Sequence, residues 1–199
     1  DARVLKTLLN FLKADSFLIT EEVIRSLKKQ LEYQKHEILG VLETCQDPRE
    51  LEALLRVLAD SIEPDFLKEL EFLFQHEDHR TRYLAIFYLG HIPAQETARI
   101  LVHCFTDSRW AIRKLAMDKI VKLGTYSVVP LIEALRHELE DVVFWALKSL
   151  VAIGEESTLT HIATLLDSGT REIRLLALEA ILAIGSEEST EIFMEAYNN

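Results

Sequence analysis

Side chains that could hold a metal ion gather in one short segment, His76-Glu77-Asp78-His79, where two histidines stand three residues apart with carboxylates between them. Imidazole nitrogens and carboxylate oxygens are common ligands of transition metals. The segment falls between two expected helices, however, and polar side chains are ordinary in such a turn. We therefore predict no metal site in this chain and interpret these residues as polar groups of a turn.

A cysteine nucleophile with a histidine base is the other chemistry that the residue types suggest. Cys104 follows His103 directly, and both are expected on one short helix. Neighbouring residues of a helix point about 100° apart, which is a poor geometry for proton transfer between the two side chains. Cys104 is therefore expected to be a packed thiol.

Common catalytic motifs are missing from the sequence. It contains no H-E-x-x-H, G-x-S-x-G or C-x-x-C pattern, and none of the glycine patterns that bind phosphates or dinucleotides. These motifs carry the chemistry of most common catalytic scaffolds. We therefore predict that the chain is not an enzyme and binds no cofactor.

Composition limits the partners and the compartment. The 199 residues include 22 Lys and Arg against 33 Asp and Glu, a formal net charge of −11. Phosphate backbones and anionic lipids repel such a chain, so nucleic acid is not an expected partner. Two cysteines without C-x-x-C spacing favour a reducing compartment, and no apolar run reaches the ~18 to 20 residues of a membrane span. We expect a cytoplasmic protein that does not insert into a membrane.

The ends of the sequence indicate a fragment. The chain begins Asp-Ala-Arg-Val, without Met and without signal-peptide character, and a further helical pattern starts shortly before its end. We expect a piece of a longer protein.

The elements that position any functional residue follow an internal repeat. Four segments share one pattern, counted from an anchor residue that is arginine in three of them. Each has alanine at offset three, leucine or isoleucine at offset seven, and isoleucine or leucine at offset ten. Glycine follows at offset eleven in three copies, and Pro93 takes its place in the first. The anchors, spaced by 31, 30 and 31 residues, are Arg82, Arg113, Val143 and Arg174.

Each copy predicts an amphipathic helix, because offsets 0, 3, 7 and 10 lie on one helical face. Alanine at offset three allows a neighbouring helix to approach closely, and glycine at offset eleven predicts a helix end. Shorter apolar-periodic stretches between the copies indicate a partner helix for each one, so every repeat is expected to be a helical hairpin. These stretches are 65–74, 96–105, 128–136 and 158–166.

Residues 1–62 follow the repeat less closely but keep a helical pattern, and Asp47-Pro48-Arg49-Glu50 is typical of a helix start. Periodicity predicts about thirteen helices in the whole chain. The predicted fold is all-α, a right-handed α-solenoid of stacked antiparallel helical hairpins, in which degenerate repeats in 1–62 continue into regular repeats in 63–199. Helical patterns in the first part cover 4–12, 23–31, 38–42 and 51–62.

In two of these copies an aspartate also precedes the anchor arginine. The residues of these two copies are Asp107, Arg113, Ala116, Ile120, Leu123 and Gly124, and then Asp167, Ile173, Arg174, Ala177, Ile184 and Gly185. They resemble bacterial HEAT repeats, particularly the short type of phycobilisome-lyase-like proteins. The resemblance covers 63–199 well and 1–62 loosely, and it is specific for fold but almost silent on function. In that family an aspartate and an arginine form a structural ladder between neighbouring repeats. The resemblance implies this role for Asp107, Arg113, Asp167 and Arg174, and for Asp78 with Arg82.

The repeat also predicts a binding face. Offsets 1, 2, 5 and 9 point away from the core and are expected to line the concave face of the superhelix. Several of these slots are aromatic where a merely solvated helix would carry charge, which is typical of a partner groove. The alternative is that offset two packs against the next repeat and the aromatics belong to the core. The residues expected to bind a partner are Tyr83, Phe87, Trp110, Lys114, Phe144, Trp145 and Lys148.

These observations favour a non-catalytic scaffold that binds a protein segment, an apolar helix or an extended peptide, along the concave face. Aromatic side chains would anchor the partner, and lysines would orient it. The resemblance implies an alternative, a lyase-like or chaperone-like subunit that handles a tetrapyrrole on a partner protein. A third hypothesis is a spacer or dimerisation module of a larger protein, which would self-associate.

Overall fold

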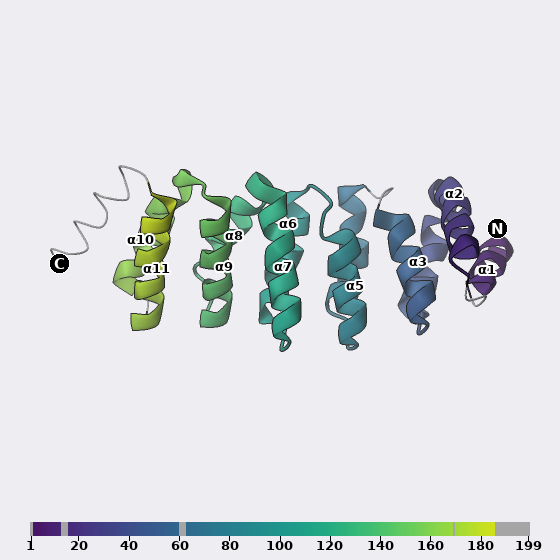
Figure 1. The fold of residues 1–199 in the computed structure, drawn as a ribbon, viewed down its shortest axis with the longest axis horizontal. Coiled ribbons are helices and arrows are strands. Elements are labelled where there is room, and N and C mark those ends of the chain that lie inside the picture. Colours follow the sequence, from purple (N-terminus) through teal and green to yellow (C-terminus); the bar gives the residue numbers. More distant parts are fainter. Residues whose placement is uncertain (1, 13–15, 60–62, 169, 186–199) are drawn as a thin grey trace. The chain divides into compact units, whose positions relative to one another are not determined.

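The computed structural model describes residues 2–12, 16–59, 63–168 and 170–185, and within these ranges the chain is all-helical, with eleven α-helices, four 3-10 helices and no strand (Figure 1). None of the described helices is both long and apolar enough to cross a membrane. The chain divides into two compact units, Asp1–Ile92 and Pro93–Asn199, the first of which ends thirty residues after the change in repeat regularity expected at 62/63.

Unit 1 is built around the long helix α2. Helix α1 packs on α2, α2 on α3, and both α3 and the short α4 pack on α5. Fully or nearly fully buried side chains from each layer form the core, among them Leu5, Leu27, Leu54, Leu73 and Ile86. The helices are α1 (Ala2–Phe11), α2 (Phe17–Thr44), α3 (Pro48–Ala59), the 3-10 helix η1 (Pro64–Leu70), α4 (Glu71–Phe74) and α5 (His79–Leu89).

The described residues form eleven α-helices, fewer than the thirteen or so predicted for the whole chain. The patterns at 23–31 and 38–42 belong to one helix, α2, because the residues between them include no glycine or proline that would stop it. The helical pattern beyond residue 185 lies outside the described residues. The stretch predicted as a helix at 65–74 is mostly the 3-10 helix η1, which begins at Pro64 and passes into α4.

Unit 2 consists of three helix pairs in two layers. The longer helices α7, α9 and α11 lie side by side, α7 against α9 and α9 against α11, while α6, α8 and α10 pack behind them (Figure 1). The pairs are α6 (Gln95–His103) with α7 (Trp110–Leu123), α8 (Val128–Ala134) with α9 (Glu140–Ile153), and α10 (Leu159–Ser168) with α11 (Arg171–Ile184). Three short 3-10 helices connect these elements. η2 (Cys104–Thr106) follows α6, η3 (Gly124–Ser127) precedes α8, and η4 (Glu156–Thr158) precedes α10.

The core face predicted from the repeat is confirmed at offsets three and seven in both units. At offset 0 only Val143 is buried, while Arg82 and Arg113 are half-buried and Arg174 is exposed. Alanine at offset three and leucine or isoleucine at offset seven are fully buried in all four copies. Offset ten is buried in the first two copies and half-buried in the other two. The four alanines are Ala85, Ala116, Ala146 and Ala177.

Glycine at offset eleven ends each of the three helices as predicted. Gly124, Gly154 and Gly185 have φ of 57°, 71° and 69°, a region that L-residues adopt only with strain. The backbone N–H groups of Gly154 and Gly185 donate to the carbonyl oxygens of Leu150 and Ile181, which satisfies acceptors at the helix end.

A second repeated device lies in the turns before the longer helices. In four turns a side chain accepts a hydrogen bond from the backbone N–H two residues later, at 2.8 to 3.0 Å. The acceptors are spaced by 29, 31 and 30 residues, so the turn has the period of the repeat and reaches back into residues 1–62. The acceptors are Asp47 Oδ1, His76 Nδ1, Asp107 Oδ1 and His137 Nδ1.

The anchor arginines close the same turns. Arg82 Nη1 donates to the carbonyl oxygens of His76 and Glu77, at 2.6 and 2.9 Å, and Arg113 Nη1 donates to the carbonyl oxygen of Asp107 at 2.6 Å. These bonds lie within one repeat, six or five residues apart in sequence. The ladder between neighbouring repeats that the resemblance implies stays a prediction.

The turn can be tested with His137. His137→Ala removes the acceptor of the Leu139 N–H and is expected to lower the free energy of unfolding by about 1 kcal/mol. His137→Asn supplies an amide oxygen instead and should stay within about 0.5 kcal/mol of the wild type. Urea denaturation of the three proteins measures the difference. Equal stability of the alanine and asparagine variants would contradict a role for the hydrogen bond.

Replacing glycine by alanine is expected to change stability in opposite directions at two positions. Gly154→Ala forces alanine into a left-handed conformation and is expected to cost about 1 kcal/mol. Gly40 lies inside α2, where an added Cβ would meet no atom within 4 Å, so Gly40→Ala should stabilise unit 1 by roughly 0.5 to 1 kcal/mol. Denaturant unfolding of both variants checks the signs, and a stabilising Gly154→Ala would overturn the assigned helix end.

Candidate functional site

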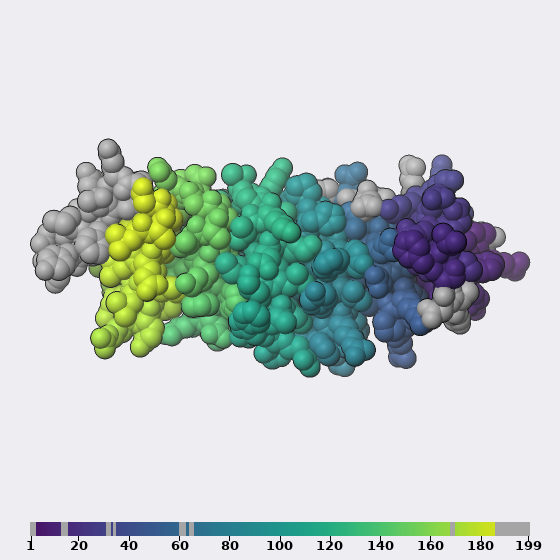
Figure 2. All heavy atoms as spheres, viewed as in Figure 1, coloured from purple at the N-terminus to yellow at the C-terminus, as the bar shows by residue number. Residues whose placement is uncertain are grey.

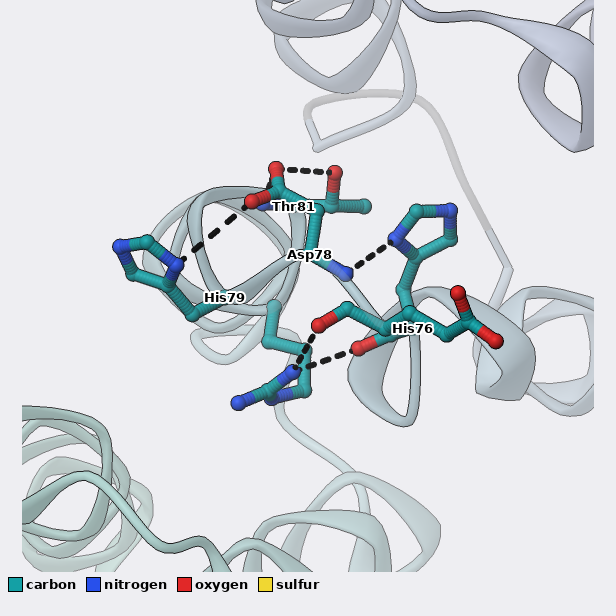
Figure 3. A network of polar contacts seen from close by, with 6 residues as sticks. His76, Asp78, His79 and Thr81 are labelled. Atoms are coloured by element: carbon teal, nitrogen blue, oxygen red, sulfur yellow. Dashed lines mark hydrogen bonds and ion pairs between the residues drawn. The ribbon is translucent and has the colours of Figure 1, made fainter.

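The segment His76-Glu77-Asp78-His79 forms the turn before helix α5 and the first residue of that helix (Figure 3). His76 Nδ1 accepts from the Asp78 N–H, and Asp78 Oδ2 accepts from the N–H and the hydroxyl of Thr81, both at 3.2 Å. His79 Nδ1 lies 3.6 Å from Asp78 Oδ1. Slight desolvation acts to raise the pKa of Asp78, but hydrogen bonds from the N–H groups of Arg80 and Thr81 outweigh it and lower that pKa. The side chains are therefore engaged in capping the helix.

No metal ligand set converges in the part of the chain that the structure describes, since no three His, Cys, Asp or Glu side chains are grouped as ligands there. Cys104 is buried, with its Sγ 3.5 Å from the Ile100 carbonyl oxygen, while His103 is exposed. The prediction that Cys104 is a packed thiol is confirmed. Burial raises the pKa of the half-buried Cys45, and the nearby Glu50 raises it further, which makes that thiol a poor nucleophile at neutral pH.

Three exposed ridges run along the longer helices of unit 2. Offsets 1, 5 and 9 are exposed on α7, α9 and α11, except that Lys114 is half-buried, and Trp110 extends the α7 ridge by one turn. We call this surface the ridge face, and Figure 2 shows unit 2 from the side on which these three helices lie. The ridges consist of Trp110, Lys114, Asp118 and Lys122 on α7, of Phe144, Lys148 and Ala152 on α9, and of Leu175, Glu179 and Ala183 on α11.

The prediction that offset two belongs to this exposed face is wrong at Trp145. That side chain is only 6% exposed, because it turns from α9 toward η2 and α7 and packs against Phe105 and Trp110. At the same offset, Leu115 and Leu176 are half-buried. Offset two is thus a flank of the helix that packs on its neighbour, as the alternative interpretation of the sequence expected.

Trp145 is the centre of an aromatic cluster that reaches from the core to the ridge face. Its ring centroid lies 6.1 Å from the buried Phe105, 6.3 Å from Trp110 and 5.6 Å from Phe144, the last in an edge-to-face arrangement. Trp110 is 61% exposed and Phe144 is 39% exposed. Two exposed rings are therefore held in fixed positions by a buried one, which reduces the conformational entropy that a partner must remove.

One lysine lies over the Phe144 ring, and others lie on α7. Lys148 Nζ is 5.8 Å from the centroid of the Phe144 ring, a cation–π distance, and Lys114 forms an ion pair with Asp118 one turn along α7. Burial lowers the pKa of Lys119, and the charge of Lys122 lowers it further. The ridge of α7 thus has two lysines, Lys114 and Lys122, and one acid, Asp118.

Beside Lys148 the ridge face is hollowed. A cavity of about 140 Å³ opens between α9 and α11, with apolar walls from Leu147, Val151 and Leu176 and with Lys148 and Glu179 at its rim. Sequence reasoning missed this cavity. The available signal was alanine at offset nine of α11, Ala183, which lines the cavity and where the equivalent residues of the first two copies, His91 and Lys122, are larger.

Unit 1 carries the remaining predicted residues on α5. Tyr83 and Phe87 are both exposed, and their rings stack with centroids 6.2 Å apart. Phe87 also meets Tyr88 edge to face at 5.0 Å, and the Tyr88 hydroxyl donates to Glu52 Oε1 at 2.7 Å. Sequence reasoning missed a second apolar surface in this unit, where Phe11, Phe17 and Leu18 are each more than half exposed at the α1–α2 corner.

The chain matches no known protein-family model and no curated protein. The arrangement of side chains therefore carries the functional argument.

The free energy of unfolding is expected to depend on pH through the Tyr88 hydroxyl. Desolvation raises the pKa of Tyr88 to about 12, and the hydrogen bond and charge of Glu52 act in the same direction. Since the unfolded value is about 10, the stabilising contribution is complete below pH ~10 and is lost as the pH rises toward 12. Between these values, the unfolding free energy of the wild type should fall more steeply than that of Tyr88→Phe. Glu52→Gln should fall between the two, and identical slopes for all three would contradict the assignment.

Proposed function

We propose that this chain is a non-catalytic scaffold that binds a segment of a partner protein on its ridge face. The proposal includes a right-handed α-solenoid of HEAT type, in which each helix pair is one repeat. The turn acceptors spaced at 29 to 31 residues and the side-by-side packing of α7, α9 and α11 support this architecture. Exposed ridges at equivalent offsets of successive helices are what an elongated partner segment requires.

The single observation that carries the proposal is the pair of exposed aromatic rings fixed by a buried third ring. An isolated exposed aromatic side chain is ordinary on a protein surface. Trp110 and Phe144, by contrast, come from two different helices and meet through Trp145 in one cluster. Preorganised aromatic anchors of this kind dominate the energetics of protein interfaces.

The predicted residues take different roles in this proposal. Trp110 and Phe144 contact the partner, and Trp145 positions them from below the surface. Lys148 and Lys114 orient the partner by charge. Tyr83 and Phe87 form a stacked pair of exposed rings on unit 1, which is a separate candidate contact on that unit.

Capture from the native lysate, followed by an affinity measurement on each captured protein, tests this function. The double variant Trp110→Ala, Phe144→Ala is expected to lose its partner, with affinity at least about tenfold lower, because truncated aromatic anchors commonly cost more than ~1.4 kcal/mol. Tyr126→Ala, which removes an exposed aromatic ring outside the ridge face, should bind like the wild type. Far-UV circular dichroism verifies that all three proteins are folded. Equal affinity of the double variant and the wild type would overturn the proposal.

A further inference from the structure

Positive charge is concentrated on one helix of an acidic chain. Residues 109–122 contain five Arg and Lys but a single acid, Asp118, whereas the whole chain has a formal charge of −11. Burial lowers the pKa of Lys119, and the nearby positive charge of Lys122 lowers it further. A partner with negative charge would offset these positive charges.

Several cations on and beside the ridge face lack an acidic partner. Among the residues that the structure describes, no carboxylate pairs with the side chains of Arg109, Lys122 or Lys148. Arg109 precedes Trp110 at the start of α7, Lys122 lies three turns further along the same ridge, and Lys148 stands over the Phe144 ring. Arg109 and Lys148 therefore lie beside the exposed rings, and Lys122 is a further cation on the α7 ridge.

The ridges of α7 and α9 carry lysines, whereas the ridge of α11 carries an acid. The ridge of α7 has Lys114 and Lys122 with one acid, Asp118, that of α9 has Lys148, and that of α11 has Glu179 as its charged residue. The cavity of about 140 Å³ lies between α9 and α11, on the side away from α7. Carboxylates of a ligand would thus lie over α7 and α9, while an apolar side chain would enter the cavity.

We propose that the ridge face binds an acidic protein segment that carries an apolar anchor residue. The carboxylates of the segment contact Arg109, Lys122 and Lys148, its backbone crosses Trp110 and Phe144, and its anchor fills the cavity between α9 and α11. This inference rests on the proposed function and specifies the chemistry of the partner. Complementary charge of this kind raises the association rate and selects among partners more than it adds affinity.

Three short synthetic peptides test the chemistry directly. The first contains Asp, Glu and Ser around a central leucine, the second replaces Asp and Glu by Asn and Gln, and the third replaces the leucine by serine. The chain's two tryptophans, Trp110 and Trp145, both belong to the aromatic cluster, so intrinsic fluorescence reports binding at this site without a label. The first peptide is expected to bind at least about tenfold more tightly than either control, and to weaken as salt rises from 50 to 300 mM.

Charge reversal on the protein provides the matched control. Lys122→Glu, Lys148→Glu should reduce the affinity for the acidic peptide by about tenfold or more and remove most of its salt dependence. Lys29→Glu, Lys68→Glu makes the same change of net charge at two exposed positions of unit 1 and should bind like the wild type. A loss of affinity with this control equal to that of the double reversal on the ridge face would show an effect of net charge alone and overturn the site.

The outcomes separate this inference from the proposed function. Equal binding of the acidic and the neutral peptide would overturn the acidic partner, and the proposed function would still stand on the Trp110 and Phe144 variants. Tighter binding of a single-stranded oligonucleotide than of the acidic peptide, in the same fluorescence assay, would also overturn it. If the lysate partner binds independently of Trp110 and Phe144, the proposed function fails first.

Discussion

One alanine on each longer helix is the constraint on which the rest of the structure depends. Ala116, Ala146 and Ala177 are fully buried on α7, α9 and α11, which pack in sequence on one another. A small side chain at this place brings helices close together, and close packing fixes the rotation of each helix about its axis. Once that rotation is fixed, the side chains at offsets 1, 5 and 9 point away from the neighbouring helices. The ridge face is therefore a consequence of how the core is packed.

The same constraint explains how much of the fold could be predicted from the sequence. Where a helix has one buried stripe, as α7 does, periodicity identifies both the core and the exposed ridge. Helix α3 has a wider buried face, since Ala53, Leu54, Leu55 and Val57 are all buried, and its polar residues Arg49, Glu52 and Arg56 share one narrow side. Helix α2 differs for another reason: no glycine or proline stands between its two apolar patterns, so the helix continues where the apolar pattern weakens.

The aromatic residues mark the limit of prediction from a single helix. Phe144 and Trp145 are adjacent on α9, and the helical period alone places both near the exposed side. Their different burial is decided by α7 and η2, whose rings Trp110 and Phe105 cover Trp145 and leave Phe144 at the surface. That decision depends on contacts between elements more than thirty residues apart in sequence. The same holds for the cavity between α9 and α11, which two neighbouring helices must form together.

Turn geometry explains why the sequence contains clusters of residue types that are also common in catalytic sites. Each turn before a longer helix requires only one hydrogen-bond acceptor for the N–H two residues later, and aspartate and histidine both supply it. Acids also favour the first turn of a helix, because they interact well with its N-terminal dipole. Histidine at the acceptor position followed by acids therefore produces His76-Glu77-Asp78 and His137-Glu138 from turn chemistry alone. Because the core face tolerates few residue types while the turn tolerates several, the repeats stay recognisable in their helices and diverge in their turns.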